Sequence, residues 1–507
     1  MSAPGDKTSV VGQRAITKPS IDKDLKKIER LEEATRTVSR AWPSVGLAAL
    51  FLAAAGVVAS LQVGAAQSSI IIIAAAIIGG YMALTIGAND VANNVGPAVG
   101  ARALTMFGAL VIAAVFEFAG ALIDGGSVVK TISKGIIDPS LVPSSDVFVW
   151  IMMSALLASA LWVHLATYLG APVSTTHSIV GGVLGAGLAA VGVEAVDWFV
   201  MASIAASWLT SPLIGGLIAA AFLAFIKIRL IYQEDKIAAA QRWVPVLVGI
   251  MSAAFGAYLL VKGLKHVWRP GFPATISIAI LIYVVTYFAA KPWVRRQSAG
   301  MENRNQSLRK LFHLPLICSA ALLSFAHGSN DVANAVGPLA AIVSSATTGE
   351  LSREVGVPIW VLVIGGFGIS LGLFLFGPRI VRIVGNQITK MNPMRAFCVA
   401  LSAALTVLVA SQLGLPVSTT HIVVGAVFGV GFFREQYTAR SRRRLEYIRT
   451  HRQRSKGRAQ ALQPDELRRR KLVRRSHFIG IVAAWVVTVP SAAGLSALIF
   501  FCSEWVR

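Results

Sequence analysis

Long apolar runs constrain the fold of this chain more than any other feature. Runs of about 17 to 25 residues, enough to cross about 30 Å of hydrocarbon as a helix, recur from residue 44 to residue 502. The chain of 507 residues is 55% hydrophobic and 14% charged, which is outside the range of soluble globular proteins. Its mean hydropathy is +0.67. Because the runs do not alternate with period two, a membrane barrel is excluded. The sequence predicts an all-α polytopic membrane protein.

The apolar runs predict thirteen membrane segments. Residues 172–191 and 417–433 are short and rich in glycine, so each either spans or re-enters the membrane, and we expect about 12 to 13 transmembrane segments. The expected segments are 44–66, 69–100, 103–122, 147–168, 172–191, 198–226, 244–262, 273–289, 314–346, 357–377, 394–413, 417–433 and 478–502.

The basic residues lie between the apolar runs. Lys and Arg number 47 against 24 Asp and Glu, a net charge of +23 that would suggest a nucleic-acid partner in a soluble protein. Here they gather in the N-terminal segment and at 227–242, 291–310 and 434–475. The positive-inside rule places these segments in the cytoplasm, where they also meet anionic lipid headgroups. We expect a multi-pass protein of the plasma (inner) membrane, with the N-terminus cytoplasmic, the C-terminus outside and no nucleic-acid partner.

Two polar motifs interrupt the apolar runs, and each occurs twice. The sequence GANDVANNVGP at 87–97 returns as GSNDVANAVGP at 328–338, and PVSTTH at 172–177 returns at 416–421. The second motif follows the first by about 85 residues in the first copy and about 88 in the second. Unpaired polar groups are costly inside a membrane, so the duplication predicts one binding site built from two halves.

Topology predicts that the two copies have opposite orientations. Alternation from a cytoplasmic N-terminus starts the first five-segment set outside and the second inside, which is the inverted repeat typical of secondary transporters. The expected organisation is a basic cytoplasmic segment (1–43), an extra transmembrane helix (44–66), a first repeat (67–226), a connecting segment with two helices (227–313), and a second repeat (314–507) that includes an Arg-rich cytoplasmic loop at 434–477.

The Asn-Asp motif has the chemistry of a cation site. Gly87 and Pro97, like Gly328 and Pro338, bracket it, so we expect each helix to unwind or kink there. Carboxylate and amide oxygens are hard ligands for a small cation, whereas interhelical hydrogen bonding would explain one Asn better than six repeated polar groups. Cation or proton coupling is predicted for Asn89, Asp90, Asn93, Asn330, Asp331 and Asn334.

Glu117 is the one acidic residue within its apolar run. Such a residue is expensive in a membrane helix, so we expect it to face the site and take part in coupling. Its position in the second half is Gly368, which makes the halves unequal there.

The Ser-Thr-Thr motif has the chemistry of an anion site. Pro172 and Pro416 can only begin a helix, and the hydroxyls and free N–H groups that follow favour an oxyanion without any basic residue. Ordinary capping would explain one Ser but not two hydroxyl-rich copies. Substrate binding is predicted for Ser174, Thr175, Thr176, Ser418, Thr419 and Thr420. Ser211 and Thr488, in a repeated Trp-to-Pro sequence, are further candidates, against the alternative that they are only kink hydroxyls.

His177 and His421 end the motif. They are either structural donors or contacts for a proton or the anion, and no ligand spacing around them predicts zinc. We expect no structural metal and no cofactor, only a co-transported sodium ion or proton. Because Asp90, Asp331 and Glu117 would repel an anion in a cavity of low dielectric, the anion needs its co-ion, which is the logic of symport by two halves rocking about a midplane site.

At these residues the chain resembles the inorganic phosphate transporter (Pit) family of secondary symporters, from about residue 70 to 502. The resemblance implies an inverted-repeat phosphate transporter coupled to sodium or protons, and in some bacterial members to metal-phosphate complexes. It implies that Asn89, Asp90, Asn330 and Asp331, with the two Ser-Thr-Thr sequences, form the ion and substrate site. Residues 1 to 66 extend beyond the common pattern, and their role stays open.

Three other interpretations remain open. A sulfate permease of the same fold would use the same hydroxyls and helix ends. An intramembrane enzyme would pair His177 or His421 with Asp90 or Asp331, but oppositely oriented copies do not supply one asymmetric acid and base pair. A channel would not explain acidic residues beside an anion site. The sequence also allows a homo-oligomer.

Overall fold

The computed structural model describes residues 43–63, 69–263, 268, 270–349, 356–387, 391–441 and 475–505. The predictions for residues 1–42 and for 442–474 of the Arg-rich loop lie outside the described residues. The chain divides into two compact units, Met1–Leu50 and Phe51–Arg507. Of the first unit, only the start of the helix Pro43–Val63 is described. Both copies of both motifs lie in the second unit.

Within the described residues the second unit is almost entirely helical, and its one isolated β-bridge joins Ile137 to Val196. The first half contains α2 (Ser69–Gly100), α3 (Met106–Asp124), α4 (Gly126–Lys130), η1 (Thr131–Gly135), η2 (Pro139–Leu141), α5 (Ser145–Leu169), α6 (Thr175–Ala190), η3 (Val193–Ala195) and α7 (Trp198–Ile226). The connecting segment contains η4 (Lys227–Ile231), α8 (Lys236–Tyr258), η5 (Leu259–Gly263), α9 (Phe272–Ser298) and α10 (Asn305–Leu311). The second half contains α11 (His313–Asp331), α12 (Ala333–Thr348), α13 (Ile359–Gln387), α14 (Pro393–Gln412), α15 (Thr419–Arg440) and α18 (Arg475–Glu504).

Ten helices of the described chain are long and apolar enough to cross a membrane, or eleven if the bent pair Asn305–Leu311 and His313–Thr348 is one span. Each of the thirteen expected segments is helical, with 314–346 divided between α11 and α12, but α6 and α15 are not among these candidate spans. Both begin at a Ser-Thr-Thr motif, and they are the two segments for which the sequence leaves a re-entrant path open. The chain is therefore a multi-pass membrane protein.

The expected break at the Asn-Asp motif is absent from the first copy. α2 stays helical from Ser69 to Gly100, through Gly87 and Pro97. In the second copy α11 ends at Asp331 and α12 begins at Ala333, but Val332 between them keeps helical dihedral angles (φ −59°, ψ −31°). The glycines serve close helix packing instead, which the sequence alone does not distinguish from a break.

Each half supplies the helix that covers the Asn-Asp helix of the other half. A Cβ atom on Gly328 of α11 would lie 2.0 Å from the carbonyl oxygen of Glu117 on α3. A Cβ atom on Gly87 of α2 would lie 1.9 Å from the carbonyl oxygen of Ile369 on α13. Backbones therefore touch at both places, as they do where small residues line a membrane helix interface. The matched contacts also make Ile369, and not Gly368 as expected, the counterpart of Glu117.

Each Ser-Thr-Thr helix likewise packs against a helix of the other half. A Cβ atom on Gly181 of α6 would meet the carbonyl oxygen of Val489 on α18 at 2.7 Å, and one on Gly425 of α15 would meet that of Pro212 on α7 at 2.2 Å. These contacts align Ser211 with Thr488, since each precedes the residue whose carbonyl is approached. The duplicated motifs thus lie in two matched sets of helix contacts.

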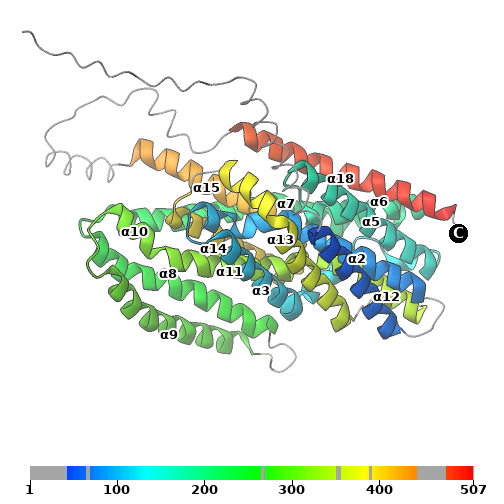
Figure 1. Ribbon diagram of the computed structural model, residues 1–507, viewed down its shortest axis with the longest axis horizontal. Helices are drawn as coiled ribbons and strands as arrows, with labels where there is room; N and C mark the ends of the chain where they lie inside the picture. The colour runs from blue at the N-terminus through cyan, green and yellow to red at the C-terminus, as the bar shows by residue number, and fades with distance from the viewer. Residues whose placement is uncertain are drawn as a thin grey trace, which may run out of the picture. The chain divides into compact units, whose positions relative to one another are not determined.

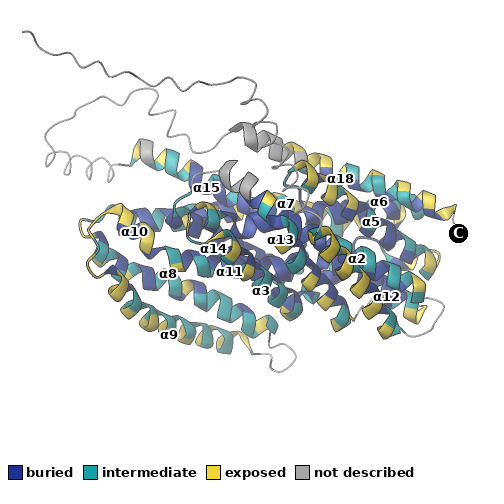
Figure 2. Cartoon of the chain, in the orientation of Figure 1, coloured by how far each residue is buried: buried dark blue, intermediate teal, exposed yellow. Residues whose placement is uncertain are grey.

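The connecting helices α8 and α9 pack against each other beside this core, where Figure 1 shows them in green. α9 is mostly half-buried or exposed, whereas the motif-bearing parts of α2 and α11 are buried (Figure 2). α8 reaches the core near its C-terminal end, where the ring of Phe255 lies 5.1 Å from that of Phe325 on α11. The segment therefore has one face against the second Asn-Asp helix.

Candidate functional site

The Ser-Thr-Thr helices begin inside the protein, after a short extended segment. Gly170 and Gly414 end the preceding helices with φ of 72° and 68°, a conformation that glycine adopts without strain. The hydroxyl of Ser174 then accepts from the N–H of His177 at 3.1 Å, and that of Ser418 from the N–H of His421 at 3.3 Å. The two serines are N-caps, and the threonines after them occupy the first turn.

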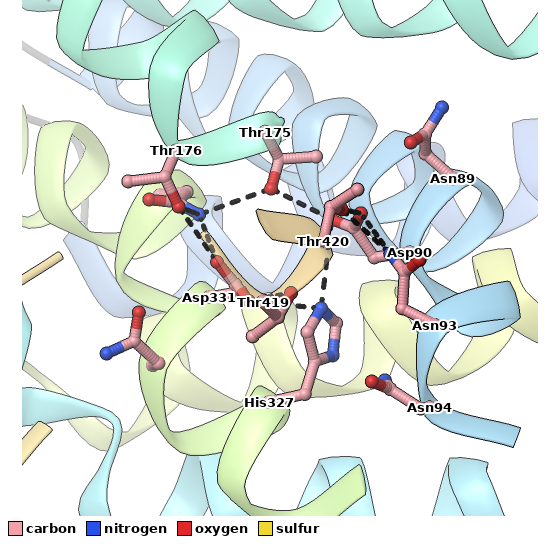
Figure 3. A network of polar contacts seen from close by, with 12 residues as sticks. Asn89, Asp90, Asn93, Asn94, Thr175, Thr176, His327, Asp331, Thr419 and Thr420 are labelled. Carbon is pink, nitrogen blue, oxygen red and sulfur yellow. Dashed lines mark hydrogen bonds and ion pairs between the residues drawn. The ribbon is translucent and has the colours of Figure 1, made fainter. Parts of the chain in front are cut away.

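Two buried carboxylates each bind hydroxyls from both halves of the chain. Asp90 accepts from Thr175 of its own half at 2.9 Å and from Thr420 of the other half at 3.0 Å. In the second half, Asp331 accepts from Thr419 at 3.1 Å and from Thr176 at 3.0 Å. Figure 3 shows the four threonines around the two aspartates. We call these six residues the Asp–Thr cluster.

An asparagine extends each side of the cluster. Asn93 donates to Asp90 at 3.2 Å and to the hydroxyl of Thr420 at 2.7 Å. Asn334 donates to Asp331 at 2.8 Å and to the hydroxyl of Thr176 at 3.2 Å. The carbonyl oxygen of the Asn334 side chain is buried without a hydrogen-bond partner among the described residues, so acceptor capacity remains there.

Asn89 and Asn330 lie one step outside the cluster. Asn89 donates to Thr167 at 2.9 Å and to the carbonyl of Ala171 at 3.4 Å. Asn330 donates to Ser411 at 2.9 Å and to the carbonyl of Leu415 at 3.2 Å. Both therefore hold the extended segment before a Ser-Thr-Thr helix, and Figure 3 shows Asn89 apart from the dashed network.

Glu117 reaches the cluster through His327, which sequence reasoning missed. His327 Nδ1 lies 3.3 Å from Glu117 Oε1, and Nε2 lies 3.2 Å from Asp331 Oδ2 and 3.8 Å from Asp90 Oδ2. Asn94 donates to the same Glu117 oxygen at 2.7 Å. An imidazole thus stands between three carboxylates, where a protonated ring would offset part of their charge.

The missed residues break the equivalence of the halves. Position 86 in the first half corresponds to His327 and holds Ile, and position 335 in the second half corresponds to Asn94 and holds Ala. A signal for His327 exists in the sequence, because it stands four residues before Asp331 and so lies on the same helix face. Asn94 is inside the motif, but its counterpart is not polar, so the duplication gave no sign of its role.

His177 and His421, which directly follow the two Ser-Thr-Thr sequences, pack against each other. Their ring centroids are 4.3 Å apart, and the rings of Trp208 and Trp485 lie against them at 3.8 Å and 3.6 Å. Neither ring nitrogen of His177, nor Nε2 of His421, has a hydrogen-bond partner among the described residues. The four rings pack across the two halves.

Ser211 and Thr488 are buried on α7 and α18. The Ser211 hydroxyl has no hydrogen-bond partner among the described residues. α7 nevertheless contacts the start of α15, since Trp208 Nε1 donates to the carbonyl of Pro416 at 3.2 Å. The two residues thus lie on the helices that pack against α15 and α6.

The arrangement offers two kinds of ligand within one buried site. Carboxylate, amide and hydroxyl oxygens around Asp90 and Asp331 suit a small cation. The N-termini of α6 and α15, with their threonine hydroxyls, suit an oxyanion.

Comparisons with known proteins agree with this chemistry. Residues 86–496 match the sequence profile of the "Phosphate transporter family". A "Putative phosphate permease" of Helicobacter pylori strain J99 is 45% identical, over 94% of this chain and 98% of that protein. A protein of the same description from Pyrococcus abyssi is 37% identical, over 84% of this chain and 96% of that protein.

A solved structure is similar over most of the chain. It is described as "The sodium-dependent phosphate transporter", and it superposes with a TM-score of 0.76 at 36% sequence identity. The match covers 86% of this chain and all (100%) of that one. The family and these relatives are transporters and permeases, not enzymes. From the profile match and the relatives together, the chain belongs to the phosphate transporter family.

Proposed function

We propose that this protein is a secondary symporter that imports inorganic phosphate together with sodium or protons by alternating access. The observation that carries the proposal is the Asp–Thr cluster, in which each carboxylate binds one threonine from each half. A site shared in this way changes whenever the two sides of the protein move relative to each other, as alternating access requires. Similarity to a solved transporter that is sodium-dependent supports sodium as the first ion to test.

Cation binding would prepare the site for phosphate. The hydroxyls of all four threonines lie within hydrogen-bond distance of a carboxylate, and a hydroxyl that donates to a carboxylate cannot donate to an oxyanion. A hydroxyl that binds a cation through its oxygen can turn its hydrogen elsewhere. A cation held by Asp90 or Asp331 would therefore both screen the negative charge and free donors for phosphate.

The remaining roles follow from position. Glu117 and His327 would adjust the charge of the cluster, and the helix N-termini with Thr175, Thr176, Thr419 and Thr420 would bind the oxyanion, free or as a metal-phosphate complex. Ser211, Thr488, His177 and His421 would line or close the site. The basic segments support a protein of the inner membrane whose N-terminus and Arg-rich loop are cytoplasmic, with the repeats in opposite orientation.

Uptake of radiolabelled phosphate into proteoliposomes tests the proposal. A sodium gradient and a proton gradient are imposed separately, and unlabelled sulfate is added as competitor. We expect accumulation with one gradient, none without a gradient, and little inhibition by sulfate. Accumulation without any gradient would contradict symport, and sulfate that competes as well as phosphate would favour an oxyanion permease of broader specificity.

A further inference from the structure

A second buried polar cluster lies outside the Asp–Thr cluster. Asp124, at the end of α3, is only 1% exposed. Tyr258 of α8 and Ser127 of α4 both donate to it, and Ser329 of α11 donates at 3.1 Å. The hydroxyls of Tyr258 and Ser329 lie 2.9 Å apart. The cluster therefore joins four elements around one carboxylate.

The Asp124 cluster includes a residue that is adjacent in the chain to the cation site proposed above. Ser329 directly precedes Asn330 and stands two residues before Asp331. Asp124 stands seven residues, or about two helical turns, after Glu117, so both acids of α3 lie on the face toward α11. α3 thus contacts the second Asn-Asp helix twice, through His327 and through Ser329.

The charge of Asp124 is compensated inside this cluster. A buried carboxylate is stable only when donors satisfy it, and here three hydroxyls do so. Lys262 of η5 donates to the Ser127 hydroxyl at 3.0 Å, which places a positive charge one hydroxyl away. Both Tyr258 and Lys262 come from the connecting segment.

The first half has no equivalent of this cluster. The position that matches Ser329 is Ala88, and the position that matches Asp124 is Phe376. The Asp124 cluster, to which the connecting segment contributes, therefore forms beside the second Asn-Asp helix and cannot form beside the first.

We propose that Tyr258 and Asp124 are positioning residues, which hold Ser329 and thereby place Asn330 and Asp331 for cation binding. The inference rests on the proposed symport. The connecting segment would then affect the affinity of the Asn330 and Asp331 side of the site for the cation. Loss of the Tyr258 hydroxyl leaves Phe325 packed on Phe255 but removes one of the donors to Asp124, the carboxylate that binds Ser329.

Kinetics of phosphate uptake test the role. In Tyr258→Phe and in Ser329→Ala we expect the apparent KM for the coupling ion, varied as sodium chloride or as a pH step, to rise about tenfold, the scale of one hydrogen bond to a charged group. Vmax per folded transporter should stay within about twofold, because no group that touches the ions is removed. Tyr283→Phe is the matched control, since the Tyr283 hydroxyl makes no hydrogen bond among the described residues.

The double variant Tyr258→Phe/Ser329→Ala separates positioning from general damage. If both residues act through Asp124, the double variant should raise KM no more than the stronger single variant does. Unchanged KM in both single variants, or additive losses confined to Vmax, would overturn the proposal.

Hydrogen exchange gives a readout that does not depend on transport. Amides of residues 325–335 should exchange faster in Tyr258→Phe than in the wild type or in Tyr283→Phe, because α11 loses an anchor. Equal exchange in all three proteins overturns the inference whether or not the wild type imports phosphate. Absence of uptake by the wild type would instead contradict the proposed function and leave the exchange result to decide the positioning role.

Discussion

The hydroxyl of Thr176 lies 3.0 Å from Asp331 Oδ1, although 155 residues separate the two in the chain. The matching bond joins Thr420 to Asp90 at 3.0 Å across 330 residues. The two bonds are equal in length. Each joins the Ser-Thr-Thr helix of one half to the carboxylate of the other half. The first two predictions test this relationship.

Loss of either cluster carboxylate should abolish coupled uptake. In Asp90→Asn and Asp331→Asn we expect the initial rate of gradient-driven phosphate uptake to fall about a hundredfold or more, or about 2.8 kcal/mol, because the amide cannot neutralise a cation. Asp146→Asn, at an exposed position of α5, is the matched control. Near-normal uptake by both cluster variants, at equal amounts of folded protein, would sink the site assignment.

The four threonines should fall into two pairs. Thr176→Val and Thr420→Val each remove the bond to the carboxylate of the other half and the acceptor of an asparagine, so we expect the larger rise in phosphate KM, about tenfold to a hundredfold. Thr175→Val and Thr419→Val should give smaller and mutually similar increases. Thr275→Val on α9 is the control. Unrelated effects within a pair would argue against a site of matched halves.

His327 should stabilise the protein by compensating Glu117. His327→Ile introduces the residue of the first half but leaves a buried carboxylate without its imidazole, at a cost of about 3 to 5 kcal/mol. The double variant His327→Ile/Glu117→Ile introduces both counterparts and should recover most of the loss. Thermal unfolding in detergent measures it, and a single variant as stable as the wild type would show that the pair is not coupled.

Backbone contact at the motif glycines should make them intolerant of a methyl group. Gly87→Ala and Gly328→Ala each require a helix pair to separate, so we expect destabilisation of about 1 to 3 kcal/mol or more. In Gly96→Ala the added Cβ has no neighbouring atom within 4 Å, and the higher helix propensity of Ala should leave Tm unchanged or raise it slightly. A Gly96 variant as damaged as the other two would point to helix distortion instead of contact.

The helical spans, and the helix starts at the Ser-Thr-Thr motifs, could be predicted from the sequence because both depend on local signals. Apolar length defined the spans, and the Ser-Thr-Thr motifs marked the first turns of α6 and α15, but both helices begin three residues after the proline that was expected to begin them. The helix break expected at Gly87 was wrong because glycine has two uses, and only the presence of Ile369 across the interface decides between them. Long-range packing of this kind leaves no trace in one sequence.

The residues that the sequence did not reveal are those without a repeat. His327 lies on one helix face with Asp331, and Asp124 on one with Glu117, but neither is duplicated, because their counterparts are Ile86 and Phe376. A search for polar residues at helical spacing from the motifs would have found both. Tyr258 could not be found in this way, because it comes from a segment outside the repeats.

The glycine contacts between α2 and α13, and between α3 and α11, mean that neither half of the chain has a complete interior of its own. Fragments cut in the connecting segment would each leave bare backbone at Gly87 or Gly328, so neither would be expected to fold without the other. For the proposed alternating access, these contacts favour rigid bodies that each contain helices from both halves over a movement of one half of the sequence against the other.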